Sequence, residues 1–157
     1  FGDLMSDAIG KENTSLLNIK LKKELELVSE INAFITGSID CGLFIISGKI
    51  TKGKGFEELD KQLWKILDEI KISGVGDQKL NALKNKIQTA KAFQEQGLLN
   101  RSINLSYFEL LGDAEDINKE NARYIEIKNN DLSLFAKKLF VKSNCSLLKV
   151  HQHDSEK

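Results

Sequence analysis

Two adjacent segments of this chain, residues 28–36 and 43–50, have the composition of β-strands. Both are rich in β-branched and aromatic side chains, and the first alternates apolar with polar residues. The stretch between them, residues 37–42, begins and ends with glycine and is typical of a turn. These features predict an antiparallel pair, in which the second strand is apolar enough to be central and covered.

Helical periodicity accounts for most of the remaining sequence. Apolar residues recur at helical spacing in two N-terminal segments, residues 4–9 and 16–25, and in four or five segments between residues 56 and 139. Residues 146–150 form a short apolar run that predicts a final strand. This order predicts an α+β fold, with a mainly antiparallel sheet and helices packed on one of its faces.

The helix expected near residue 100 has a regular apolar pattern. Leu99, Ile103, Ser106 and Leu110 recur at helical spacing, and Leu110 is predicted to face the core. Gly112 is expected to end this helix in a left-handed conformation, and Asp113 is expected to cap the next one.

Length and charge limit the classes of function. The 157 residues fit one domain, predicted at residues 1–150, followed by a polar tail at residues 151–157. Lys and Arg together number 23, as do Asp and Glu, so no net charge attracts nucleic acid or an anionic lipid surface. The longest apolar runs are too short to span a bilayer. We therefore expect no nucleic-acid partner and no membrane partner.

The sequence contains no recognisable catalytic or metal-binding motif. A catalytic zinc site needs three protein ligands and a water, but the two histidines, His151 and His153, both lie in the tail. A serine or cysteine nucleophile would lack a histidine base in the body of the domain. The lysine-rich and glycine-rich stretch at residues 48–55 lacks the spacing of a phosphate-binding loop. We expect no metal, no cofactor and no catalytic residue in this chain.

Residues 98–114 carry a more specific signal. They include YFELLGDA at residues 107–114, and the segment resembles the C-terminal domain of the pitrilysin/insulinase family of zinc metallopeptidases, which includes mitochondrial processing peptidase. The closest likeness is to bacterial members of that family. It extends to GKENTSLL at residues 10–17, to the strand pair and to the closing helix and strand, so it covers residues 2–150.

The resemblance implies a fold and a division of roles. In that family two similar α/β halves form a clam-shell that encloses unfolded peptides, and an N-terminal half holds zinc through an inverted HxxEH motif and a distant Glu. This chain contains no such motif, so it resembles the C-terminal, non-zinc half, with zinc expected in a missing N-terminal half. The family half also begins with strands that would precede Phe1, so we expect a domain truncated at its N-terminus.

The resemblance also implies two substrate-binding positions. Many relatives place an Arg and a Tyr, separated by six residues, on the half that faces the zinc. Lys22 and Ser29 occupy the matching positions here. Lysine keeps the positive charge of arginine but loses its bidentate fork, and serine loses the phenol.

Two hypotheses of function follow from the resemblance. The first is the wall of a chamber in which a zinc metallopeptidase cleaves short or unfolded peptides. The alternative is a non-catalytic structural subunit of the same fold, and an HxxEH motif upstream would decide between them. The expected partners are a zinc-binding half or second subunit, a peptide substrate and, through exposed strand edges, a second copy in a homodimer. The resemblance points to a bacterial protein of the cytoplasm or periplasm.

Overall fold

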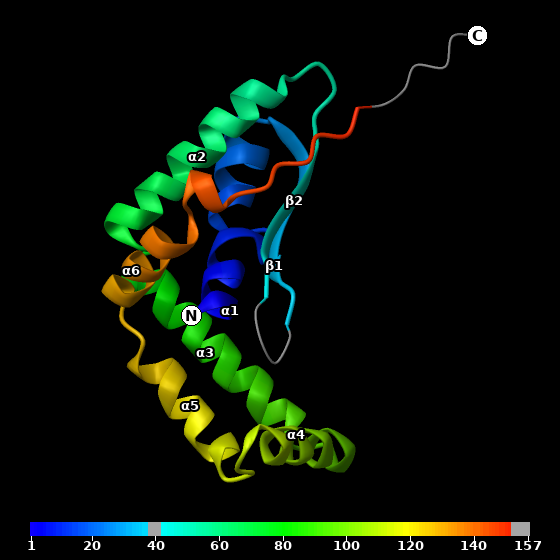
Figure 1. Cartoon of the computed structure of the whole chain (residues 1–157), viewed down its shortest axis with the longest axis vertical. Coiled ribbons are helices and arrows are strands. Elements are labelled where there is room, and N and C mark those ends of the chain that lie inside the picture. Colours follow the sequence, from blue (N-terminus) through cyan, green and yellow to red (C-terminus); the bar gives the residue numbers. More distant parts are fainter. Residues whose placement is uncertain (38–41, 152–157) are drawn as a thin grey trace, which may run out of the picture.

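The structure, a computed structural model, describes residues 1–37 and 42–151 (Figure 1). Two strands follow a short helical segment at the N-terminus, and five longer helices follow the strands. In chain order the elements are α1 (Gly2–Ser6), η1 (Asp7–Lys11), η2 (Asn18–Glu24), β1 (Val28–Ile35), β2 (Phe44–Ile50), α2 (Phe56–Ser73), α3 (Asp77–Gln94), α4 (Leu98–Leu111), α5 (Asp116–Glu126), α6 (Asn129–Leu139) and η3 (Lys142–Asn144). The elements η1 and η2 are π-helices, and η3 is a 3₁₀-helix.

The two strands form an antiparallel hairpin, as the sequence predicts. In its register Ala33 lies opposite Ile46, and Ile35 lies opposite Phe44, with a bulge near the start of β1 between Val28 and Glu30. The tip of the connection, residues 38–41, lies outside the described residues. The α+β class is confirmed, with a sheet of two strands in the part of the chain that the structure describes.

The hydrophobic core lies against one face of the hairpin. The N-terminal helices, β1, α2 and α6 all contribute fully or nearly fully buried side chains to it: Leu4, Met5, Ala8, Ile9, Leu17, Leu21, Ile31, Ala33, Ile66, Leu67, Ile70, Leu132 and Ala136. Figure 1 shows these helices on the same side of the hairpin, which confirms the predicted packing. The opposite face of the hairpin carries exposed side chains.

The Asn129 side chain, at the start of α6, forms hydrogen bonds with the turn between α2 and α3. Its side-chain Oδ1 accepts hydrogen bonds from the backbone N–H groups of Val75, at 2.9 Å, and Gly76, at 3.0 Å. Its Nδ2 donates to the carbonyl of Ser73 at 2.7 Å. Four residues further along α6, the hydroxyl of Ser133 donates to the carbonyl of Lys71 at 2.6 Å. The pair α2 and α6 is therefore joined by polar contacts as well as by its apolar faces.

The C-terminal half of α3, α4 and α5 extend away from this core as a helical arm (Figure 1). The structure describes α4 and α5 in full, and neither contains a buried residue. The prediction that Leu110 faces the core is therefore wrong, because the exposed fraction of its side chain is 72%. Helical spacing identifies an apolar face, but here no element of the same chain covers that face.

Two further predictions need correction. Residues 146–150 are not a strand, and Leu147, Leu148 and Val150 are exposed, because this extended segment has no hydrogen-bonded strand beside it among the described residues. Asp113 does not cap α5, which begins at Asp116 after Glu115. The Asp113 carboxylate instead accepts the N–H of Glu115 at 2.8 Å, so the chain makes a turn before the helix starts.

Gly112 ends α4 as the sequence predicts. Its φ is 137°, a positive value that glycine tolerates better than other residues, and its N–H donates to the carbonyl of Glu109 at 3.1 Å. Of the predicted tail, residues 152–157 lie outside the described residues.

Candidate functional site

The uncovered face of the hairpin is graded from charged to apolar. Three cross-strand pairs share this face, and they are Glu30 with Lys49, Asn32 with Ser47, and Phe34 with Ile45. All except the half-buried Ile45 are exposed. The charged pair lies nearest the start of β1 and the apolar pair nearest the tip of the hairpin. A surface of this kind offers both polar contacts and an apolar contact to an extended chain.

Lys22 and Ser29 lie on either side of the tight turn that leads from η2 into β1. Lys22 is half-buried in the last turn of η2, and Ser29 is exposed near the start of β1. The Ser29 hydroxyl donates to the carbonyl of Lys49 at 3.2 Å, which ties it to the charged end of the open face. In the described part of the chain, no hydrogen bond or ion pair joins Lys22 to Ser29. The structure therefore brings the two residues to one turn without direct contact.

Backbone hydrogen bonds hold this turn in an unusual shape. The N–H of Leu25 donates to the carbonyl of Lys20, at 3.1 Å, and the N–H of Leu27 donates to that of Leu21, at 2.8 Å. Between them Glu26 has a φ of 50°, a left-handed conformation that is uncommon outside glycine. Wide π-turns such as η2 are rare and occur frequently at functional sites.

Asn18 fixes the start of η2 against the rest of the fold. It is buried, with an exposed fraction of 5%. Its Nδ2 donates to the Gly10 carbonyl at 3.1 Å, the Ser15 hydroxyl at 2.9 Å and the Ile31 carbonyl at 3.3 Å. One amide group therefore joins η1, η2 and β1, and it sets the position of the turn that carries Lys22 and Ser29.

A network of ions joins η1 to α3. The nearly buried carboxylate of Asp7 lies 3.0 Å from the Lys11 ammonium and 4.0 Å from that of Lys86. Lys86 also pairs with Glu12, and the hydrogen bond it donates lowers the pKa of the Glu12 carboxyl. The same hydrogen bond raises the pKa of Lys86. The two carboxylates and two ammonium groups balance in charge, which accounts for the packing of η1 against α3, although Asp7 Oδ1 accepts no hydrogen bond among the described residues.

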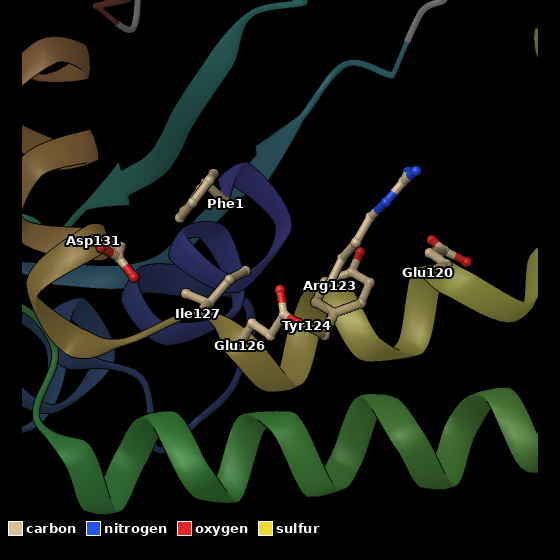
Figure 2. Close-up of a pocket in the computed structure, with 7 residues that line it drawn as sticks. All are labelled: Phe1, Glu120, Arg123, Tyr124, Glu126, Ile127 and Asp131. Carbon is tan, nitrogen blue, oxygen red and sulfur yellow. The ribbon is translucent and has the colours of Figure 1, made fainter. Parts of the chain in front are cut away.

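A pocket of about 640 Å³ lies beside α5, and no sequence pattern indicated it (Figure 2). Its lining combines aromatic, aliphatic and charged residues: Phe1, Glu120, Arg123, Tyr124, Glu126, Ile127 and Asp131. Burial and the nearby Asp3 carboxylate raise the pKa of Tyr124 to about 12, and the phenol donates a hydrogen bond to that carboxylate at 3.3 Å. In Figure 2 the Arg123 side chain extends away from α5. Helical periodicity indicates which face of α5 is apolar but not a pocket beside that face, and no residue of α5 is buried.

The residues that the structure describes do not fit a zinc centre. Among the described residues, no group of three or more His, Cys, Asp or Glu side chains could hold a metal ion. His151 is exposed, and its ring packs edge-on against Phe56 with the centroids 5.0 Å apart. His153, the other histidine, lies outside the described residues.

A family model described as the peptidase M16 inactive domain matches residues 2–87, which is more than half of the chain. The chain belongs to the peptidase M16 family. This assignment confirms the resemblance to the pitrilysin/insulinase family, and the matched M16 domain is the inactive one. No curated protein matches the chain significantly.

Solved structures of bacterial proteins share the fold of this chain. A protease from Helicobacter pylori superimposes with a TM-score of 0.80 at 16% identity, over 90% of this chain, which spans 34% of the length of that protein. A "putative zinc protease" from Bordetella pertussis Tohama I superimposes with a TM-score of 0.76 at 21% identity. The match covers 90% of this chain and 78% of that one. The inactive peptidase domain of another such protease, from Bordetella parapertussis, superimposes with a TM-score of 0.78 at 18% identity. The match covers 98% of this chain and 84% of that one. At these identities the likeness establishes the fold.

No helix in the described part of the M16 chain is long and apolar enough to cross a membrane.

Proposed function

We propose that this M16 domain forms a wall of the substrate chamber of a zinc metallopeptidase whose zinc is held by another half. One observation carries the proposal: the helices pack on one face of the hairpin and leave its other face open, with a polar and an apolar end. An extended peptide can lie along such a face. The substrate class that suits it is a short or unfolded peptide, because a folded protein would not present an extended segment.

In this proposal Lys22 and Ser29 contact the substrate from the turn at the charged end of the open face. The Lys22 ammonium would attract a peptide carbonyl or carboxylate as a point charge. The Ser29 hydroxyl already donates to the Lys49 carbonyl, so it has lone pairs left to accept a hydrogen bond from a peptide N–H. The zinc-binding half would supply the metal and the general base, and this chain would contribute contacts that hold the substrate.

The alternative function is a non-catalytic subunit with the same fold. The substitution of Lys22 and Ser29 for the arginine and tyrosine of many relatives supports it, because a pair that no longer holds substrate is free to vary. The two functions differ in whether Lys22 affects turnover. A compartment in the bacterial cytoplasm or periplasm is compatible with both.

A charge reversal tests the proposal in the complete protease, with this chain joined to its zinc-binding half. We expect Lys22→Glu to lower kcat/KM for an unfolded fluorogenic peptide by tenfold or more, a loss of about 1.4 kcal/mol of transition-state stabilisation or greater. Lys22→Arg, which restores the fork, should keep or raise kcat/KM. The matched control is Lys52→Glu, which changes the same charge at an exposed loop position.

Zinc content and the unfolding midpoint are measured for each variant, so that a loss of turnover cannot come from lost metal or lost folding. Equal kcat/KM for Lys22→Glu and Lys52→Glu would contradict the substrate role of this turn and favour the non-catalytic subunit.

A further inference from the structure

The pocket beside α5 has aromatic and aliphatic walls. Its lining includes two aromatic rings, that of Phe1 immediately before α1 and that of Tyr124 on α5, and the buried side chain of Ile127 (Figure 2). The Phe1 ring stacks on Phe135, with the ring centroids 5.8 Å apart. No described residue of the hairpin lines the pocket. A concave site of this volume, with apolar walls and a few polar groups, is the usual form of a small-ligand site.

Two of the charged side chains that line the pocket already have a partner of opposite charge. The Glu120 carboxylate lies 2.5 Å from the ammonium group of Lys91, on α3. The Arg123 guanidinium lies 3.5 Å from the carboxylate of Asp116, in the first turn of α5. Arg123 is the one basic side chain among the described residues that line the pocket, and its charge is therefore matched outside the pocket.

Two other carboxylates of the lining have no such partner. Within the part of the chain that the structure describes, neither Glu126 nor Asp131 forms an ion pair, although Asp131 accepts the backbone N–H of Lys128 at 2.9 Å. A third carboxylate, that of Asp3, accepts a hydrogen bond from the Tyr124 phenol at 3.3 Å. Burial and the neighbouring carboxylates raise the pKa of this phenol to about 12. The electrostatic potential in the pocket is therefore negative.

The structure also contains an ammonium group held against one of these aromatic rings. The Lys91 Nζ lies 4.8 Å from the centroid of the Tyr124 ring, in addition to its contact with Glu120. The face of an aromatic ring attracts a cation, and a neighbouring carboxylate adds to that attraction. Lys91 is not part of the pocket lining, so its ammonium does not fill the pocket.

We propose that this pocket binds a primary alkylammonium group. The ammonium would lie beside the carboxylates of Glu126 and Asp131, and its hydrocarbon stem would lie against Phe1 and Ile127. An anionic ligand would be repelled by the two carboxylates, and a neutral apolar ligand would gain nothing from them. A small free amine and the lysine side chain of a peptide share this chemistry. The inference does not depend on the proposed peptidase role.

NMR titration of the chain at low ionic strength tests the proposal, with n-butylammonium chloride as the probe and n-butanol as its neutral counterpart. We expect n-butylammonium to shift the amide signals of Tyr124 and Ile127 saturably, with a Kd of about 1–10 mM for so small a ligand. Glu126→Gln should raise this Kd about fivefold or more, the factor for one unit charge about 4 Å away in water. Glu57→Gln, at an exposed position on α2, is the matched control.

A peptide with a single lysine, acetyl-Ala-Ala-Lys-Ala-Ala-amide, distinguishes the two sources of the ammonium group. A lysine-binding pocket should give the same shifts with this peptide at a lower Kd than with n-butylammonium, whereas a pocket for a free amine should respond to n-butylammonium alone. Absence of saturable shifts with n-butylammonium, or equal shifts with n-butanol, would overturn the proposal. So would a Kd that Glu126→Gln leaves unchanged or that Glu57→Gln raises equally.

Discussion

Gly10→Ala should lower the free energy of unfolding by about 3 kcal/mol, although an alanine in place of a helical glycine ordinarily gains about 1 kcal/mol. A Cβ atom at position 10 would lie 2.4 Å from the backbone nitrogen and 2.5 Å from the Cβ of Ala33. These atoms belong to β1 itself, so η1 or the strand must move to make room. The close approach of helix and strand therefore requires glycine at this point.

Urea unfolding followed by the fluorescence of Trp64, the single tryptophan, measures this effect. Gly55→Ala is the matched control, because a Cβ there meets nothing within 4 Å. It should change the free energy of unfolding by no more than about 1 kcal/mol, the range for a residue before a helix. If Gly10→Ala were as stable as the control, η1 would not lie this close to β1.

Asn18→Asp should destabilise the fold by about 3 kcal/mol or more at pH 8, because it replaces a buried donor with a carboxylate. The Asn18 amide donates to the carbonyls of Gly10 and Ile31 and to the Ser15 hydroxyl. A carboxylate cannot donate to these oxygens, and burial with two carbonyls nearby disfavours its charge.

The loss of stability in the Asn18→Asp variant should also depend on pH. Burial and the surrounding oxygens raise the pKa of the introduced carboxyl in the folded state above its value in the unfolded chain. The stability of this variant is then greatest below the unfolded pKa and falls as the pH rises through the folded pKa. Unfolding at pH 4 and pH 8 measures the difference, with Asn13→Asp at an exposed position as the control. An equal pH dependence for the two variants would show that Asn18 is not a buried donor.

The sequence was sufficient to predict elements that have a clear local pattern and an apolar face covered by other residues of the same chain. The strand pair is an example, because the alternation at residues 28–36 and the turn after it determine a hairpin without reference to distant residues. The apolar stripe of α2 is another, since Ile66, Leu67 and Ile70 recur at helical spacing and are buried. In both cases the core that covers the apolar face comes from the same chain.

The sequence was insufficient where an apolar pattern has no partner within the chain. Leu110 has the spacing of a core residue, and periodicity indicates which face is apolar but not what covers it. Residues 146–150 have the composition of a strand, yet a strand also needs a neighbour with a free edge. The capping role of Asp113 failed for a different reason, because an aspartate can form a turn with its own backbone as well as cap a helix.

The residues of the candidate site were identified partly from the family resemblance and partly from the structure. The resemblance selected Lys22 and Ser29, and the structure places them at one turn beside the open face of the hairpin. Their contact with substrate stays a prediction. The buried amide of Asn18 joins three separate elements, and the pocket beside Tyr124 brings Phe1 against residues 120–131, so no single motif could have indicated either of them.

The central claim is that this M16 domain contributes shape and substrate contacts but no metal. Zinc analysis of the purified chain, after incubation with equimolar zinc and dialysis, tests it most directly. We predict well under one zinc per chain, because the sequence has no set of three ligands with suitable spacing. One tightly held zinc per chain, lost when His151 and His153 are both replaced by alanine, would contradict the account.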